Sequence, residues 1–139
     1  MDILQTAFIM ALILCVGYAS INGGRTGKAG ACIFLAATVL SAAAASRNPT
    51  WASTSYGLFA VDIGCLFALI LLAINSNRFW PIWALGFQTV AVATHIATMW
   101  IPDIVPASYQ ALLSFWAVPI LWVMVTGTRK DRQYERSRA

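Results

Sequence analysis

Two ionisable side chains, Asp62 and His95, fall inside long apolar stretches of the sequence. An ionisable residue at the centre of a bilayer costs at least about 2.5 kcal/mol, so such residues usually face the interior of a helix bundle and often have a function. An Asp–His pair in a site of low dielectric constant can relay protons, because histidine titrates near neutral pH and a carboxylate stabilises its imidazolium form. The same pair can instead be a structural hydrogen bond between two helices. The structural bond is the simpler interpretation, and a proton, ion or ligand role is the alternative.

Further polar residues recur at helical spacing around this pair. Gln88 and Thr98 share a helix face with His95, and Cys65 lies one turn from Asp62. Two more polar residues follow at a similar depth in the last apolar stretch, which gives a predicted intramembrane cluster of Asp62, His95, Cys65, Gln88, Thr98, Gln110 and Ser114.

The residue types in this cluster do not match a known cofactor or catalytic pattern. Asp62, Cys65 and His95 have no metal-ligand spacing, and a lone histidine is too few for a bis-histidine haem. Neither a nucleophile–base pair nor a pair of carboxylates is visible. We therefore predict no metal, no cofactor apart from bound lipid, and no enzymatic activity.

The elements that must position these residues are apolar helices. The chain has 139 residues, of which 60% are hydrophobic and 10% are charged, whereas a soluble domain carries roughly 25% charge. A membrane-spanning helix needs roughly 20 mostly apolar residues, and the strict alternation of a barrel strand is absent. The predicted fold is an all-α membrane protein, a bundle of five transmembrane helices at about 3–21, 29–46, 56–75, 79–101 and 107–126.

Basic residues predict how the bundle is oriented. All Lys and Arg residues except Arg47 fall in the linker after the first span, the hairpin after the third, or the segment 127–139. Cytoplasmic loops carry an excess of Lys and Arg, so we expect the N-terminus outside and a basic cytoplasmic tail at 127–139 after a single bundle at 1–126. The residues expected to set the topology and contact lipid headgroups are Arg25, Lys28, Arg78, Arg129, Lys130 and Arg132.

Short connections and special residues refine this picture. The segment 75–78 allows only a tight hairpin, which would make the third and fourth spans antiparallel neighbours and bring Asp62 and His95 to the same depth within about one helical turn. Residues 22–28 are rich in glycine and are expected to form a flexible linker, because their resemblance to a phosphate loop fails at two positions. Trp80 is expected at the cytoplasmic interface, and Pro119 predicts a kink in the last helix.

The C-terminal half carries a resemblance. The run Arg78-Phe79-Trp80-Pro81-Ile82-Trp83, the pair Thr94-His95, and later Trp116, Pro119 and Gly127-Thr128-Arg129 resemble small uncharacterised multi-pass inner-membrane proteins of alphaproteobacterial type. The resemblance implies a bacterial inner membrane and implies no activity.

Two classes of function follow from these observations. The favoured one is an accessory or structural subunit that packs in a larger membrane complex or a homo-oligomer, through the small residues Ala37, Ser41 and Ala45 and the polar face of the fourth span. The alternative is a small transporter or a proton- or ion-conducting protein that uses Asp62 and His95. A phage-type pore is a third possibility. Membrane lipids and an integral membrane protein are the expected partners, and nucleic acid is not, because the tail offers only Tyr134 for stacking.

Overall fold

The structure is a computed structural model that describes residues 3–47, 56–100 and 106–137. These residues form five α-helices: α1 (Ile3–Asn22), α2 (Gly24–Arg47), α3 (Tyr56–Ile74), α4 (Trp80–Trp100) and α5 (Pro106–Arg136). The predicted all-helical fold is confirmed. Three segments, Gly24–Ser46, Tyr56–Ile74 and Trp80–Trp100, are long and apolar enough to cross a membrane.

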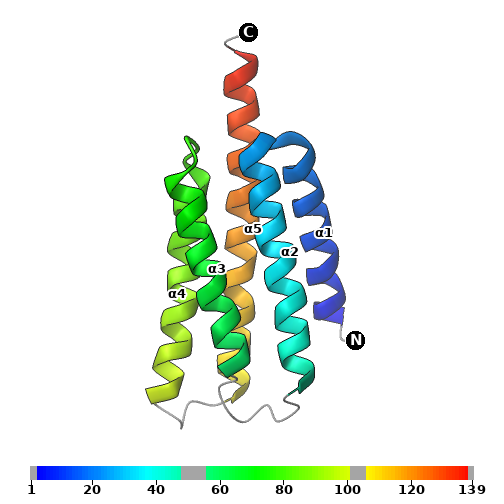
Figure 1. Ribbon diagram of the computed structural model, residues 1–139. Helices are drawn as coiled ribbons and strands as arrows, with labels where there is room; N and C mark the ends of the chain where they lie inside the picture. The colour runs from blue at the N-terminus through cyan, green and yellow to red at the C-terminus, as the bar shows by residue number, and fades with distance from the viewer. Residues whose placement is uncertain (1–2, 48–55, 101–105, 138–139) are drawn as a thin grey trace.

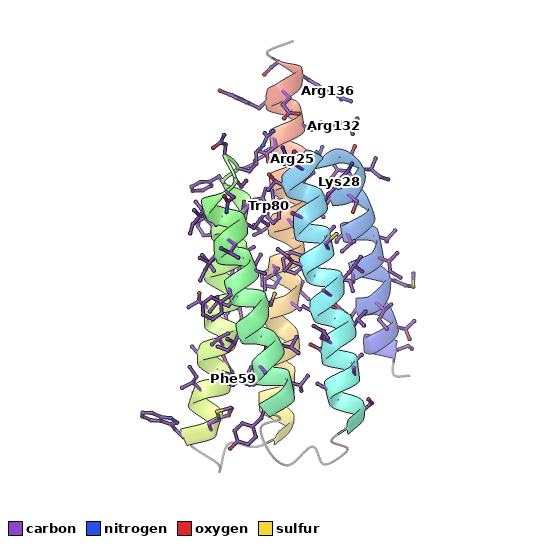
Figure 2. The ribbon with its side chains drawn as sticks, in the orientation of Figure 1. Arg25, Lys28, Phe59, Trp80, Arg132 and Arg136 are labelled. Atoms are coloured by element: carbon purple, nitrogen blue, oxygen red, sulfur yellow. The ribbon has the colours of Figure 1, made fainter. Side chains whose placement is uncertain are left out.

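The helices run alternately up and down and close into a ring (Figure 1). Each helix packs on its neighbours in the chain, and α5 also packs on α1 and touches α2. The α1–α2 and α3–α4 connections lie at one end of the bundle, together with the C-terminal part of α5, and the N-terminus lies at the other end. We call the first of these the basic end, because Arg25, Lys28 and Arg132 gather there (Figure 2).

The start of α2 differs from the predicted linker. Residues 24–28 are helical, and only Gly23 separates α1 from α2. Backbone hydrogen bonds run from Gly23 N to Ala19 O and from Gly27 N to Gly23 O, each 2.8 Å long, and Gly24 takes the left-handed backbone conformation with φ 56°. A Cβ on Gly23 would lie 2.6 Å from the Ala19 carbonyl oxygen. The glycines therefore serve a close helix–helix turn, and the prediction of a flexible linker was wrong.

The end of α5 also differs from the predicted tail, because the helix continues to Arg136. Arg78, in the α3–α4 hairpin, contacts Glu135 and lies 3.6 Å from Asp131. The hydrogen bond to Glu135 is the main cause that raises the pKa of Arg78 above its ordinary value. Burial is the main cause that raises the pKa of Asp131 above its ordinary value, while the charge of Arg78 lowers it. These contacts support the helical conformation of residues 127–136, which the sequence predicted to be a simple tail.

Trp80 anchors the basic end of the core. Only 3% of its surface is exposed, whereas the neighbouring Phe79 and Trp83 are exposed. A Cβ on Gly30 of α2 would lie 2.5 Å from the Trp80 ring, and a Cβ on Gly127 of α5 would collide with the root of the same side chain. The indole therefore fills the space between three helices, and the two glycines leave room for it.

Candidate functional site

Asp62 and His95 are in direct contact. Because the hairpin makes α3 and α4 antiparallel neighbours, the two side chains reach each other, and His95 Nε2 lies 2.7 Å from Asp62 Oδ2. The His95 side chain is only 2% exposed, while that of Asp62 is 29% exposed. The imidazole is therefore enclosed by protein, and the carboxylate keeps one accessible side.

Gln88 completes the polar cluster from a position two turns along α4. Its side-chain nitrogen donates to Asp62 Oδ1 at 3.1 Å and to the Asp62 backbone carbonyl at 3.2 Å. One carboxylate oxygen thus faces an amide donor, and the other faces an imidazole nitrogen. Gln88 itself is buried, so its hydrogen bonds to Asp62 partly offset the cost of removing both groups from water.

Phe59 lies beside His95. The two ring centroids are 5.9 Å apart, with their planes tilted by 58°. Phe59 precedes Asp62 by about one turn of α3 and lies toward the end of the bundle opposite the basic end (Figure 2). It shields the imidazole from that direction.

Asp62, Gln88 and His95 line a cavity inside the ring of helices. The cavity has a volume of about 280 Å³ and receives residues from all five helices. Its wall is mostly apolar, with aromatic residues prominent, and the polar groups of α3 and α4 converge on one part of it. This pattern is typical of a small-molecule site near the lower limit of size. The lining residues are Phe8, Leu12, Phe34, Ala37, Thr38, Ser41, Leu58, Asp62, Cys65, Gln88, Ala91, His95, Trp116, Ala117, Ile120 and Leu121.

A packed apolar layer separates this cavity from the basic end. On every helix, the next buried residues toward that end are apolar, and none of the described side chains in the layer is ionisable. The layer contains Val16, Ala19, Ala31, Leu69, Trp80, Ala84 and Met124. Within the described part of the chain, no polar path therefore leads from Asp62 to the basic end.

The other predicted cluster residues have different outcomes. Cys65 lines the cavity one turn from Asp62. Thr98 does not line it, and its hydroxyl donates to the carbonyl oxygens of His95 at 2.8 Å and Thr94 at 3.2 Å. Gln110 and Ser114 belong to α5, but their side chains lie outside the described residues. Among the described side chains, no three His, Cys, Asp or Glu residues gather as metal ligands would.

Sequence reasoning missed part of the cavity wall. Thr38 and Ser41 of α2 line the cavity, and so does Trp116, whose ring stacks on Phe87 at a centroid distance of 6.3 Å. Ser41 had been interpreted only as a small packing residue. The spacing of Phe34, Thr38 and Ser41 on one face of α2 is the signal that could have placed this helix at the site.

The predicted basic residues divide into two groups. Arg78 and Arg132 bridge elements, because Arg78 contacts α5 and Arg132 donates to the side chain of Asn22 at the end of α1. Arg25, Lys28, Arg129 and Lys130 are exposed at the same end of the bundle. The charges thus gather at one end, as expected if they set the topology.

Comparisons with protein-family models, with curated proteins and with solved structures find no match to this chain. The groups of the site themselves define its chemistry. The carboxylate of Asp62 can accept hydrogen bonds or a proton, Gln88 donates, and His95 can do either according to its protonation. Together they can hold a proton and pass it to a molecule in the cavity.

Proposed function

We propose that the protein is a small transporter of the bacterial inner membrane, with five spans and a proton-exchanging pair, Asp62 and His95, at its binding site. The observation that carries this proposal is that the pair is in contact on the wall of a cavity shared by all five helices. A contact that only fastened two helices would need no cavity beside it. Buried ionisable groups in membrane helices are also characteristic of substrate and proton pathways.

The gathering of basic residues at one end supports an orientation with the N-terminus outside and the C-terminus in the cytoplasm. In this orientation Asp62 and His95 lie in the outer half of the bundle. The apolar layer around Leu69, Trp80 and Met124 then closes the cytoplasmic side. The arrangement corresponds to a binding site closed on its cytoplasmic side, and it is unlike the continuous polar path of a pore.

The wall of the cavity indicates the chemistry of its ligand. Phe8, Phe34 and Trp116 offer apolar and aromatic contacts, while Asp62 and Gln88 supply polar contacts at one place. The ligand that fits is a small, mainly apolar molecule with one hydrogen-bonding group. Its polar group would compete with His95 for the carboxylate, so binding of the ligand and exchange of a proton would be coupled.

The accessory-subunit function remains a second proposal with weaker support. The face of α4 that was expected to bind a partner is turned inward, because Gln88 and His95 are buried against Asp62. Ala37 and Ser41 of α2 likewise line the internal cavity. Most of the residues that suggested a partner therefore line the inside of the bundle, although Ala45 is exposed.

Proton flux in reconstituted vesicles tests the proposed transport function. Vesicles that contain the protein and a trapped pH-sensitive dye are given a pH gradient, and wild type is compared with Asp62→Asn and His95→Gln. We expect flux above that of empty vesicles for wild type, and a loss of at least about tenfold in either variant, in the range typical for removal of a proton-transfer group. Thr98→Val is the matched control, because its hydroxyl bonds to its own helix and does not line the cavity.

A second measurement uses the fact that His95 is the only histidine of the chain. In protein labelled with ¹⁵N-histidine, the imidazole signals report His95 alone, without assignment. We expect them to differ between wild type and Asp62→Asn, because the substitution removes the carboxylate that lies 2.7 Å from the His95 ring nitrogen. Identical signals in wild type and Asp62→Asn, together with equal flux in the two proteins, would overturn the proposal.

A further inference from the structure

A groove runs along the outer seam between α2 and α3, in two successive hollows. The hollow at the basic end has a volume of about 680 Å³ and is lined by Arg25, Thr26, Ala29, Leu72 and residues 75–78. The next hollow has a volume of about 580 Å³ and is lined by apolar and small residues: Cys32, Ile33, Ala36, Ala37, Leu40, Ala60, Val61, Gly64, Cys65 and Ala68. Both hollows use the same helix faces, because their lining residues recur every three or four positions along α2 and along α3.

The hollow at the basic end is polar and positively charged. Arg25 is exposed and has no acidic partner among the described residues. Arg78 is held by Glu135 and Asp131, and a guanidinium has five N–H donors, more than these contacts use. Thr26 and Ser76 bring their hydroxyl oxygens within 3.2 Å of each other. An arginine of α2 and an arginine of the α3–α4 hairpin, with two hydroxyl groups beside them, are suited to the oxygens of a phosphate group.

The second hollow is apolar, and most of its lining residues are small. A Cβ on Gly64 would meet nothing within 4 Å, so open space lies above this glycine. From Ala29 to Leu40 the groove extends roughly 16 Å at 1.5 Å per residue. This is about half of the roughly 30 Å hydrocarbon layer, or the depth of one leaflet.

We propose that the α2–α3 groove binds one phospholipid with an anionic headgroup. The phosphate lies at Arg25 and Arg78, and an acyl chain follows the groove past Gly64 to the middle of the membrane. The groove is positively charged and polar at the basic end and apolar farther along, which matches the anionic headgroup and the apolar acyl chain of a phospholipid. Cys65 and Ala37 line both this groove and the central cavity, so the bound chain would lie one layer of side chains away from the Asp62 site.

A helix from a second copy of the chain fits the same groove less well. Within residues 3–47, 56–100 and 106–137, a second copy has no unpaired carboxylate to offer Arg25, because Asp62 contacts His95, and Asp131 and Glu135 contact Arg78. Burying a charge without a partner is strongly unfavourable. A lipid phosphate supplies that partner.

Lipid binding by the purified full-length protein in mild detergent tests this proposal. Native mass spectrometry and thermal unfolding are followed with added phosphatidylglycerol, with phosphatidylcholine of the same chains, and with inorganic phosphate. We expect one phosphatidylglycerol per chain and a raised unfolding midpoint, a smaller effect of phosphatidylcholine, and none of inorganic phosphate.

Two variants probe the two ends of the groove, each with a matched control. Arg25→Gln removes a headgroup contact and should weaken phosphatidylglycerol binding about fivefold, the effect expected of one basic residue at an anionic surface. Its control is Lys130→Gln, an exposed basic residue at the same end that does not line the groove. Gly64→Leu fills the apolar hollow and should weaken binding of both phospholipids. Its control is Gly86→Leu on α4, where a Cβ also meets open space.

Three outcomes would overturn the proposal. Equal binding of phosphatidylglycerol and phosphatidylcholine in wild type would show that the arginines do not select the headgroup. If inorganic phosphate stabilises the protein as strongly as phosphatidylglycerol and Gly64→Leu has no effect, the site takes free phosphate. A dimer that Gly64→Leu converts to a monomer, with lipid binding unchanged, would mean that the groove holds a second copy. None of these outcomes depends on the transport function, since the groove residues Arg25 and Gly64 do not line the central cavity.

Discussion

At the level of single residues, the contact between Asp62 and His95 depends on which way each helix turns its faces. The residue types and their similar depth were visible in the sequence, but a rotation of either helix by half a turn would have separated them. Gln88 lies on the same face of α4 as His95 and donates to the second carboxylate oxygen of Asp62, which fixes the orientation of that carboxylate. The three side chains therefore act as one unit, and a substitution of any one alters the hydrogen bonding of the other two.

Glycine residues at the basic end carry a residue-level prediction. Gly127→Ala should lower the free energy of unfolding by about 1–3 kcal/mol, because its Cβ would overlap the root of the Trp80 side chain, which cannot swing away. Unfolding of the protein in mixed detergent micelles, followed by circular dichroism, measures this loss. Gly86→Ala is the control and should leave stability unchanged or slightly raised, since its Cβ meets open space. Equal stability of the two variants would contradict the packing of Trp80 against Gly127.

At the level of elements, local composition was misleading at two helix ends. The segment 24–28 has the glycine content of a loop, yet it forms the first turns of α2, because its glycines allow α2 to follow α1 after a single residue. Residues 127–136 have the polarity of a solvated tail, yet they continue α5. In both places, contacts with another helix override the local pattern.

The extension of α5 gives a prediction for hydrogen exchange. Arg78→Gln removes both contacts to Asp131 and Glu135 and should speed amide exchange of residues 131–136 by up to about fivefold, since exposed ion pairs contribute at most about 1 kcal/mol. Amides of residues 120–127, packed on the core, should exchange as in wild type. Arg129→Gln changes a neighbouring exposed charge on α5 and is expected to have no such effect. Exchange of residues 131–136 in wild type at the rate of an unstructured peptide would rule out the helical extension.

At the level of the whole molecule, the closed ring gives the two ends of the bundle different characters. One end carries the basic residues, and there Trp80 and the packed apolar layer fill the space between the helices. The central cavity and its polar cluster lie beyond that layer. The packed layer therefore closes the cavity toward the basic end, and the proposed transport function would require this layer to open during a transport cycle.

Reporter fusions test the proposed orientation of the whole bundle. Green fluorescent protein fused after Ala139 should fluoresce, and alkaline phosphatase at the same position should be inactive, because basic loops stay in the cytoplasm. The same pair of reporters fused after Trp100, at the opposite end of α4, serves as an internal control and should show the reverse pattern. A fluorescent fusion at both positions would contradict five alternating spans.

The sequence by itself determined the class of the protein, the approximate extent of its helices and the end of the bundle to which the charges go. These properties follow from hydropathy and charge along the chain, which act locally. The tertiary structure alone decided that Asp62, Gln88 and His95 meet, that Trp80 turns inward, and that residues 24–28 and 127–136 are helical. Those outcomes depend on the rotation and close approach of helices from distant parts of the chain, and hydropathy does not specify rotation because both the lipid-facing and the packed sides of these helices are apolar.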